Sequence, residues 1–359
     1  MERPFPPMPF PLSVLDLSPL PAGSSSTRAL RNTLDLATLA DRLGYGRYWV
    51  GEHHNLPSVI CSSPEVIIGH VASVTREIRV GSGGIMLPNH APLRIAEAFH
   101  TLEALHPGRI DLGLGRAPGS DGRTALALRR SVERVNADEF PELLDELLAF
   151  GSGDFPPGHP FRGVRALPDD VPLPPVWILG SSDFGARLAA LRGFGFGFAH
   201  HFSAQWALPA ARAYRDNFRP SKHSAIPHLI LTVTAVCAET DAEANHLAST
   251  LDLASVRRAR GEFAPLVNPD EAMTYPYSAS ERAVVENFRE NVFVGSPQTV
   301  QAGVEAVVAA TRADEVMIST MVWDHAARRR SYELLAGTFG LTARATGEAA
   351  RPEFEFAVS

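Results

Sequence analysis

Short apolar segments that alternate with amphipathic ones are the feature that most limits how this chain can fold. Eight segments have the composition of β-strands, namely residues 12–17, 48–50, 78–86, 108–115, 176–179, 196–199, 228–236 and 315–319. Between them, apolar residues recur at the three- and four-residue spacing of an α-helix. Alternating strands and helices predict a parallel sheet. Eight repeats in a chain of 359 residues favour a closed (β/α)8 TIM barrel over an open sheet.

Two stretches interrupt this alternation. Residues 151–175 are rich in glycine and proline and predict an insertion loop or a short hairpin. Residues 257–291 have weak periodicity and are treated as a second insertion. Both are small enough to decorate a barrel, so we expect residues 1–359 to form a single domain. A long helical region at 121–150 is expected to break near Asn136, and the tail from about residue 342 to be poorly ordered.

Net charge and cysteine content limit the binding partners and the cellular compartment that we expect for this chain. The net charge of -7 argues against general binding to nucleic acid or to anionic membranes. Cys61 and Cys237 have no zinc-type spacing, so a reducing cytoplasm is favoured over a disulfide framework. The N-terminus lacks the apolar core of a secretory signal, and no run of about 18 apolar residues predicts a membrane helix.

A carboxylate and two imidazoles, those of Glu52, His53 and His54, come directly after the strand predicted at 48–50. Ionisable groups at the carboxyl end of a barrel strand lie where such barrels carry out their chemistry. They could bind a metal ion, act as a general base, contact a cofactor or serve the structure. Adjacent residues of a strand point to opposite faces, so a shared metal ion is the weakest of these hypotheses, and we predict no metal site.

Two further histidines, His200 and His201, end the strand predicted at 196–199. They belong to the same end of the barrel as the first pair. This position makes His200, together with His54, a candidate for the side of the site that faces the substrate. Ordinary surface histidines are the alternative.

Residues suited to holding a phosphate gather at the same predicted end. Arg116 follows the strand at 108–115, and its guanidinium offers a fixed fork of hydrogen-bond donors. Gly180, Ser181 and Ser182 lie between a strand and a helix, where backbone N–H groups and two hydroxyls can bind an anion. A salt bridge for Arg116 and plain N-capping by Ser182 are the structural alternatives.

Glycines interrupt the third predicted strand at 81–84. Glycine inside a strand predicts a bulge filled by neighbouring side chains or the close approach of something flat. The glycines at 113–119 do not match the dinucleotide-binding pattern GxGxxG, because their spacing is GxGxxxG and Pro118 stands where a helix should begin. Gly83 and Gly84, the phosphate-binding candidates and the imidazoles together predict a site for a planar, phosphorylated cofactor.

These segments resemble the bacterial-luciferase-like flavin-dependent monooxygenases, and most closely the LLM-class oxidoreductases of group 1. The resemblance rests on LSVLDLSP at 12–19, RYWVGEHH at 47–54, PEV at 64–66, RVGSGGIMLPNHAP at 79–92, PGRIDLGLGRAPG at 107–119 and WILGSS at 177–182. It implies a TIM barrel that binds FMN at the carboxyl ends of its strands. It also implies a homodimer that receives reduced FMN from a separate NAD(P)H:FMN reductase and uses O2 to oxidise a small organic substrate.

The resemblance also assigns roles to single residues. His53 is similar to the catalytic histidine of the luciferase subunit. Gly83 and Gly84 fall where the family often has a non-prolyl cis peptide against the flavin ring. Arg116 and Ser181 resemble residues that hold the flavin phosphate.

Beside Ser181, Ser182 is a further phosphate candidate, and Gly180 replaces an acidic residue of the luciferases. The phosphate is therefore expected to depend more on backbone N–H groups. Two other functions remain open. One is hydride transfer with the deazaflavin F420, and the other is a non-catalytic flavin-binding subunit.

Overall fold

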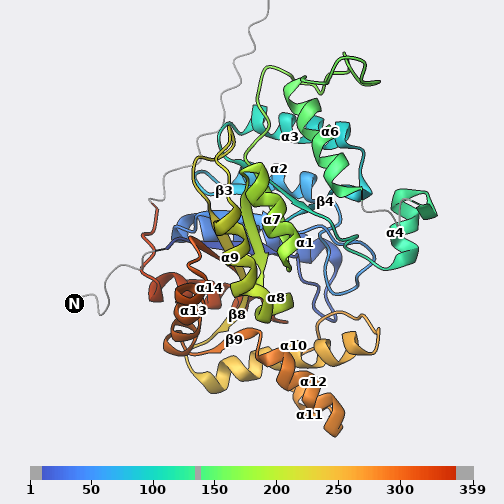
Figure 1. Ribbon diagram of the computed structural model, residues 1–359. Coiled ribbons are helices and arrows are strands. Elements are labelled where there is room, and N and C mark those ends of the chain that lie inside the picture. Colours follow the sequence, from blue (N-terminus) through green and yellow to red (C-terminus); the bar gives the residue numbers. More distant parts are fainter. Residues whose placement is uncertain (1–9, 134–138, 345–359) are drawn as a thin grey trace, which may run out of the picture.

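A closed β-barrel forms the centre of the molecule, as the computed structural model shows for residues 10–133 and 139–344 (Figure 1). Its strands are parallel and follow the chain around the barrel, and the last strand pairs with the first. In chain order they are β1 (Leu12–Asp16), β2 (Arg47–Val50), β3 (Arg79–Ser82), β5 (Ile110–Gly115), β6 (Val176–Gly180), β7 (Gly195–Ala199), β8 (Leu229–Cys237) and β10 (Glu315–Ser319). The predicted (β/α)8 TIM barrel is confirmed.

Amphipathic helices surround the barrel. Helix α1 (Ser26–Leu43) buries an apolar face that includes Leu36 and Leu39, and it ends at Gly44, whose φ of 90° is left-handed. The other helices that follow the barrel strands are α2 (Pro64–Val74), α3 (Pro92–Leu105), α4 (Gly122–Arg129), α6 (Phe140–Ser152), α7 (Asp183–Arg192), α8 (His200–Ser203), α9 (Ala207–Asn217), α10 (Asp241–Ala259), α13 (Pro297–Thr311) and α14 (His325–Thr338). None of the described helices is long and apolar enough to cross a membrane.

The third predicted strand is divided in two by its glycines. Strand β3 ends at Ser82, and β4 (Ile85–Met86) begins after a cis peptide bond between Gly83 and Gly84. Both short strands pair with β5. The strand expected at 78–86, with its interruption at the glycines, is thus present as two short strands separated by Gly83 and Gly84.

The two expected insertions differ in structure. After α6, the chain up to residue 175 contains no strand, so the alternative of a hairpin is wrong. The stretch 257–291 is largely helical, with α11 (Pro269–Thr274) and α12 (Ala279–Arg289) following α10. Figure 1 shows these three helices grouped at one end of the molecule. The break expected near Asn136 and the tail beyond residue 344 lie outside the described residues.

A strand that the sequence did not predict follows α12. Strand β9 (Val292–Gly295) pairs with the last four residues of β8. It lies outside the closed ring formed by the pairing of β10 with β1 and with β8. Its four residues are too few to show an alternating pattern.

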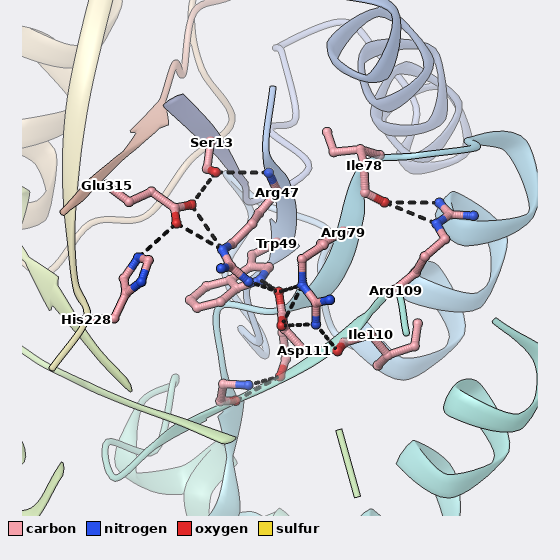
Figure 2. Close-up of polar contacts among 12 residues, drawn as sticks. Ser13, Arg47, Trp49, Ile78, Arg79, Arg109, Ile110, Asp111, His228 and Glu315 are labelled. Atoms are coloured by element: carbon pink, nitrogen blue, oxygen red, sulfur yellow. Dashed lines mark hydrogen bonds and ion pairs between the residues drawn. The ribbon is translucent and has the colours of Figure 1, made fainter. Parts of the chain in front are cut away.

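Charged side chains fill the barrel at the amino ends of its strands (Figure 2). Nη1 of Arg47 donates to Asp111 at 2.6 Å, and its Nε donates to Glu315 at 3.0 Å. Nη2 of Arg79 donates to the same Asp111 carboxylate at 2.6 Å, and Nε2 of His228 lies 3.2 Å from Glu315. Burial alone would raise the pKa of Asp111, but the two guanidinium groups lower it. We call these five residues the charged layer.

An apolar layer lies next to the charged layer on the side of the carboxyl ends. Nε1 of Trp49 donates to Asp111 at 3.1 Å, which ties the two layers together. The guanidinium carbon of Arg47 lies 4.7 Å from the ring centre of Trp177, and the two tryptophan rings meet edge to face at 5.5 Å. The members of this apolar layer are Leu15, Trp49, Trp177, Ile230 and Met317.

Replacing Asp111 with alanine is expected to destabilise the protein by about 3–5 kcal/mol, because Arg47 and Arg79 would lose the buried carboxylate that they share. Denaturant unfolding followed by circular dichroism measures the free energy of unfolding. Glu239→Ala is the control, since its ion pair with Arg330 is about half exposed and should contribute at most about 1 kcal/mol. Equal losses in the two variants would contradict the central place of Asp111.

Candidate functional site

The carboxyl ends of the barrel strands surround a cavity, here called the first cavity. The apolar layer forms its base, through Leu15, Trp49 and Met317. The residues that the sequence predicted around a cofactor all line it, and they are His53, Gly83, Gly84, Arg116, Gly180, Ser181 and Ser182. They come from four different strand ends, which a parallel barrel places on one face.

One wall of the first cavity is made of backbone, between β3 and β4. A Cβ atom on Gly83 would lie 2.6 Å from Cδ1 of Leu15, and one on Gly84 would lie 2.6 Å from the carbonyl oxygen of Gly113. Both distances are far shorter than a van der Waals contact. At Gly84 the contact is with backbone, so packing against the neighbouring strand requires glycine, whereas at Gly83 the end of the Leu15 side chain could shift. The consequence for the cavity is a wall of peptide units without side chains.

A positively charged corner lies on another side of the cavity. The guanidinium carbon of Arg116 lies 4.2 Å from the ring centre of Phe184, which belongs to the first turn of α7. The amino end of α7 adds free backbone N–H groups and the positive end of the helix dipole. Ser182 is the N-cap residue, yet its side chain makes no capping bond, so plain N-capping does not account for it. With Ser181 beside it, the corner combines a guanidinium, a helix amino end and two hydroxyls.

Glu52 is buried and organises the loop after β2. Its carboxylate accepts hydrogen bonds from the amide of Met86 at 2.7 Å, from Nε2 of His54 at 2.8 Å and from Nε2 of His90 at 2.9 Å. Burial alone would raise the pKa of Glu52, but these hydrogen bonds, led by that of His90, lower it. Burial likewise opposes the protonation of His90, but the contact with Glu52 raises its pKa overall.

This arrangement corrects one prediction and adds one residue. His54 was expected to face the substrate, but its ring is turned toward Glu52 and lines neither cavity described here. His90 was missed. Its signal in the sequence was its place in the 79–92 segment, six residues after Gly84, but the pairing with Glu52 depends on the fold.

His53 lies in the wall of the first cavity with an uncharged ring. Burial lowers the pKa of His53 to about 4. Its Nδ1 lies 3.8 Å from Sγ of Cys61, a thiol whose pKa is raised by burial. A neutral imidazole has one N–H donor and one acceptor nitrogen, so His53 can both give and accept a hydrogen bond.

The two histidines after β7 do not lie as predicted. His200 is buried and stacks on Phe293 of β9, with 5.7 Å between ring centres, and it lines neither cavity. His201 lines the first cavity, and its Nδ1 lies 3.1 Å from the carbonyl oxygen of Thr232. The histidine of the site is therefore His201 and not His200. The physical reason is that the chain turns into α8 at His200, and β9 supplies the surface that covers its ring.

A second cavity adjoins the first. The two share the side chains of Leu17, His53, His201 and Phe202. The opposite wall of the second cavity is formed by α10 and by residues 262–267, so the stretch treated as an insertion contributes to the site. His53 and His201 thus stand on the boundary between two spaces.

We expect His53 and His90 to titrate at widely different pH values. The ring of His53 should stay neutral until the pH falls to about 4. Folding raises the pKa of His90, so the stability contributed by its pair with Glu52 is present below the unfolded pKa of about 6.5 and is lost as the pH rises through the folded value. Long-range ¹H–¹⁵N spectra of the imidazoles measure both midpoints. Glu52→Gln should lower the midpoint of His90, and an unchanged midpoint would contradict the contact.

Proteins with similar sequences and similar structures are known. A family model described as luciferase-like monooxygenase matches residues 10–315. A luciferase-like monooxygenase of Escherichia coli (strain K12) is 42% identical over 322 residues, which cover 90% of this chain and 95% of the relative. An N-acetyl-S-alkylcysteine monooxygenase of Bacillus subtilis (strain 168) is 32% identical, with coverage of 90% and 97%. The crystal structure of apo-MsnO8 matches with a TM-score of 0.86 at 37% identity, covering 93% and 100%.

More distant structures share the barrel alone. One is the oxygenating constituent of 3,6-diketocamphane monooxygenase from Pseudomonas putida in complex with FMN, with a TM-score of 0.69 at 19% identity and coverage of 94% and 100%. Another is an F420-dependent secondary alcohol dehydrogenase, with a TM-score of 0.63 at 15% identity and the same coverage. The family model and the closer relatives span most of the chain. The chain therefore belongs to the family of luciferase-like monooxygenases.

Proposed function

We propose that this protein is a monooxygenase that binds FMN in the first cavity and uses reduced FMN and O2 to oxidise a small organic substrate. The observation that carries the proposal is the composition of this cavity. It has a positive corner on one side, a wall of bare peptide units on another, and a neutral imidazole where it meets the second cavity. Membership of the monooxygenase family supports the reaction class.

The residues present fit a flavin phosphate at one end and a flat ring at the other. Arg116, Ser181 and Ser182 would hold the phosphate, together with the backbone N–H groups after Gly180. The peptide units of Gly83 and Gly84 offer a surface without side chains against which a ring can lie. The apolar layer would give that ring an apolar surface to contact, since Trp49, Leu15 and Met317 line the cavity base.

When bound, reduced flavin supplies the electrons that activate O2. The role of the protein in this chemistry would be to control the movement of protons and the access of water. His53 is neutral at physiological pH, so one of its ring nitrogens can accept a proton and the other can donate a hydrogen bond at the boundary of the two cavities. The apolar side chains of Leu17 and Phe202 would keep this boundary poor in water, which would protect reactive species from hydrolysis.

The proposal includes a partner and an assembly. The FMN-binding neighbour is named as an oxygenating constituent, which supports a separate protein for flavin reduction. We propose that an NAD(P)H:FMN reductase has this role here. The name N-acetyl-S-alkylcysteine monooxygenase supports a small organic substrate. A cytoplasmic homodimer completes the proposal and rests on the sequence resemblance.

Hydride transfer with F420 is the second candidate, because an F420-dependent alcohol dehydrogenase has the same barrel. Titration of the protein with FMN and with F420 separates the two functions. Tight binding of FMN together with weak binding of F420 supports the monooxygenase, and the reverse order replaces it with the hydride-transfer enzyme. A non-catalytic subunit would bind flavin but would not alter its reaction with O2.

Arg116→Ala should weaken FMN binding about 10- to 100-fold, as expected for the loss of ~1.5–3 kcal/mol from a charge-assisted hydrogen bond to phosphate. Riboflavin lacks the phosphate, so its affinity should not change. Calorimetric titration of both flavins measures the difference. Arg187→Ala is the matched control on α7, since Arg187 pairs with the exposed Asp183 and does not line the cavity. Equal weakening of FMN and riboflavin would contradict the phosphate site.

His53→Ala should leave FMN affinity nearly unchanged and accelerate the reoxidation of bound reduced FMN to FMN and H2O2. A change of about a hundredfold is expected for a positioned proton-transfer group. Stopped-flow mixing of reduced FMN–protein with O2 measures this rate. Glu52→Ala should instead lower stability and FMN affinity, because the buried hydrogen bonds of Glu52 hold the loop at Met86 in place. The roles assigned to the two residues would be wrong if both variants lost binding and reactivity equally.

A further inference from the structure

We propose that the substrate is a small organic acid with an apolar body, and that Arg258 binds its acidic group in the second cavity. The inference rests on the proposed function, since it names the substrate class of the same site. It is carried by the second cavity alone, whose walls differ in character from those of the first.

Arg258 is a guanidinium without a counter-charge. It lies in the last turn of α10 and lines the second cavity. Within the part of the chain that the structure describes, its side chain forms no hydrogen bond and no ion pair, whereas the nearby Arg260 pairs with Glu281 and Arg289 with Asp252 at 2.6 Å. The side chain of Arg258 is exposed to solvent at the edge of the cavity, although the neighbouring protein still lowers its pKa through partial desolvation. A bound anion would supply the counter-charge that the described residues do not provide.

The two carboxylates that line the same cavity are engaged elsewhere. Asp121 caps α4, where it accepts hydrogen bonds from the amide of Thr124 at 3.0 Å and from its hydroxyl at 2.6 Å. Glu262 is exposed and acts on Arg260, whose pKa it helps to raise. Neither carboxylate pairs with Arg258 among the described residues. The positive charge of Arg258 is therefore left for a ligand.

A second polar group on the same helix face points to a ligand independently. Thr250 is 1% exposed and lines the second cavity, yet its hydroxyl has no hydrogen-bond partner among the described atoms. Thr250, Ala254 and Arg258 follow one another at a spacing of four residues, so they lie on one face of α10. A buried hydroxyl is stabilised only when it is hydrogen-bonded, and a polar atom of the ligand body would satisfy it.

The rest of the cavity suits an apolar body that extends toward the flavin. Apolar side chains dominate its walls, among them Leu56, Val59, Phe263, Leu266, Phe288 and Met321. Burial lowers the pKa of both His53 and His201, and the positive charge of Arg258 contributes to each shift. Arg258 is thus within electrostatic reach of the boundary between the cavities. A ligand held there by its acidic head would present its body to His53.

The test uses calorimetric titration of the purified protein with three probes of equal chain length, namely octanoate, octane-1-sulfonate and octan-1-ol. At least one anion should bind about tenfold more tightly than the alcohol, and the better of the two identifies the acid as a carboxylate or a sulfonate. Arg258→Ala should remove this difference and leave alcohol binding unchanged. Arg258→Lys should restore part of it. Arg260→Ala, which removes a paired arginine at the same end of α10, should bind the anions as the wild type does.

Two results would overturn the inference. One is an equal affinity of the wild type for the anions and the alcohol. The other is a loss of anion binding in Arg116→Ala rather than in Arg258→Ala, because the acid would then occupy the positive corner of the first cavity. The titration needs no flavin. A failure of the acid to bind is therefore distinct from a failure of FMN to bind, which the flavin titrations report separately.

Discussion

The buried carboxylate of Asp111 is the group on which the interior of the barrel depends. It receives Arg47 from β2 and Arg79 from β3, and Arg47 in turn reaches Glu315 on β10. Strand starts that are far apart in the sequence are thus held by one set of charges. Because Trp49 also donates to Asp111, this set positions the apolar layer that forms the base of the first cavity. The base of the cavity at the carboxyl ends of the strands is therefore positioned by ion pairs at their amino ends.

A second carboxylate, that of Glu52, does similar work at the carboxyl ends. It joins the loop after β2 to Met86 and His90 beyond the cis peptide, so the peptide wall and His53 keep a fixed relation. The two neighbouring histidines thereby acquire different characters. His54 is bound to the carboxylate, whereas His53 is left in an apolar wall with a neutral ring. The side chains of Glu52, His53 and His54 leave the backbone in different directions. Glu52 and His54 therefore support the loop, whereas His53 is placed in the cavity wall, where it could take part in the reaction.

The sequence predicted the barrel and the lining of the first cavity, since each of those residues ends a strand and parallel strands end on one face. It could not predict where His54 and His200 point. His54 turns toward Glu52, whose orientation depends on the distant residues Met86 and His90. His200 stacks on Phe293, which belongs to a strand too short to recognise. The wall of the second cavity was missed for a related reason. Residues 257–291 have weak periodicity because α10 to α12 pack partly against one another rather than on the barrel.

The charged and apolar layers leave the barrel interior filled from its amino end up to the base of the first cavity. Both cavities consequently open toward the same end of the molecule, with His53 and His201 between them. A ligand in either cavity therefore lies next to side chains that also line the other cavity, namely Leu17, His53, His201 and Phe202. The occupancy of one cavity thus changes the surroundings of the two histidines that a ligand in the other cavity meets.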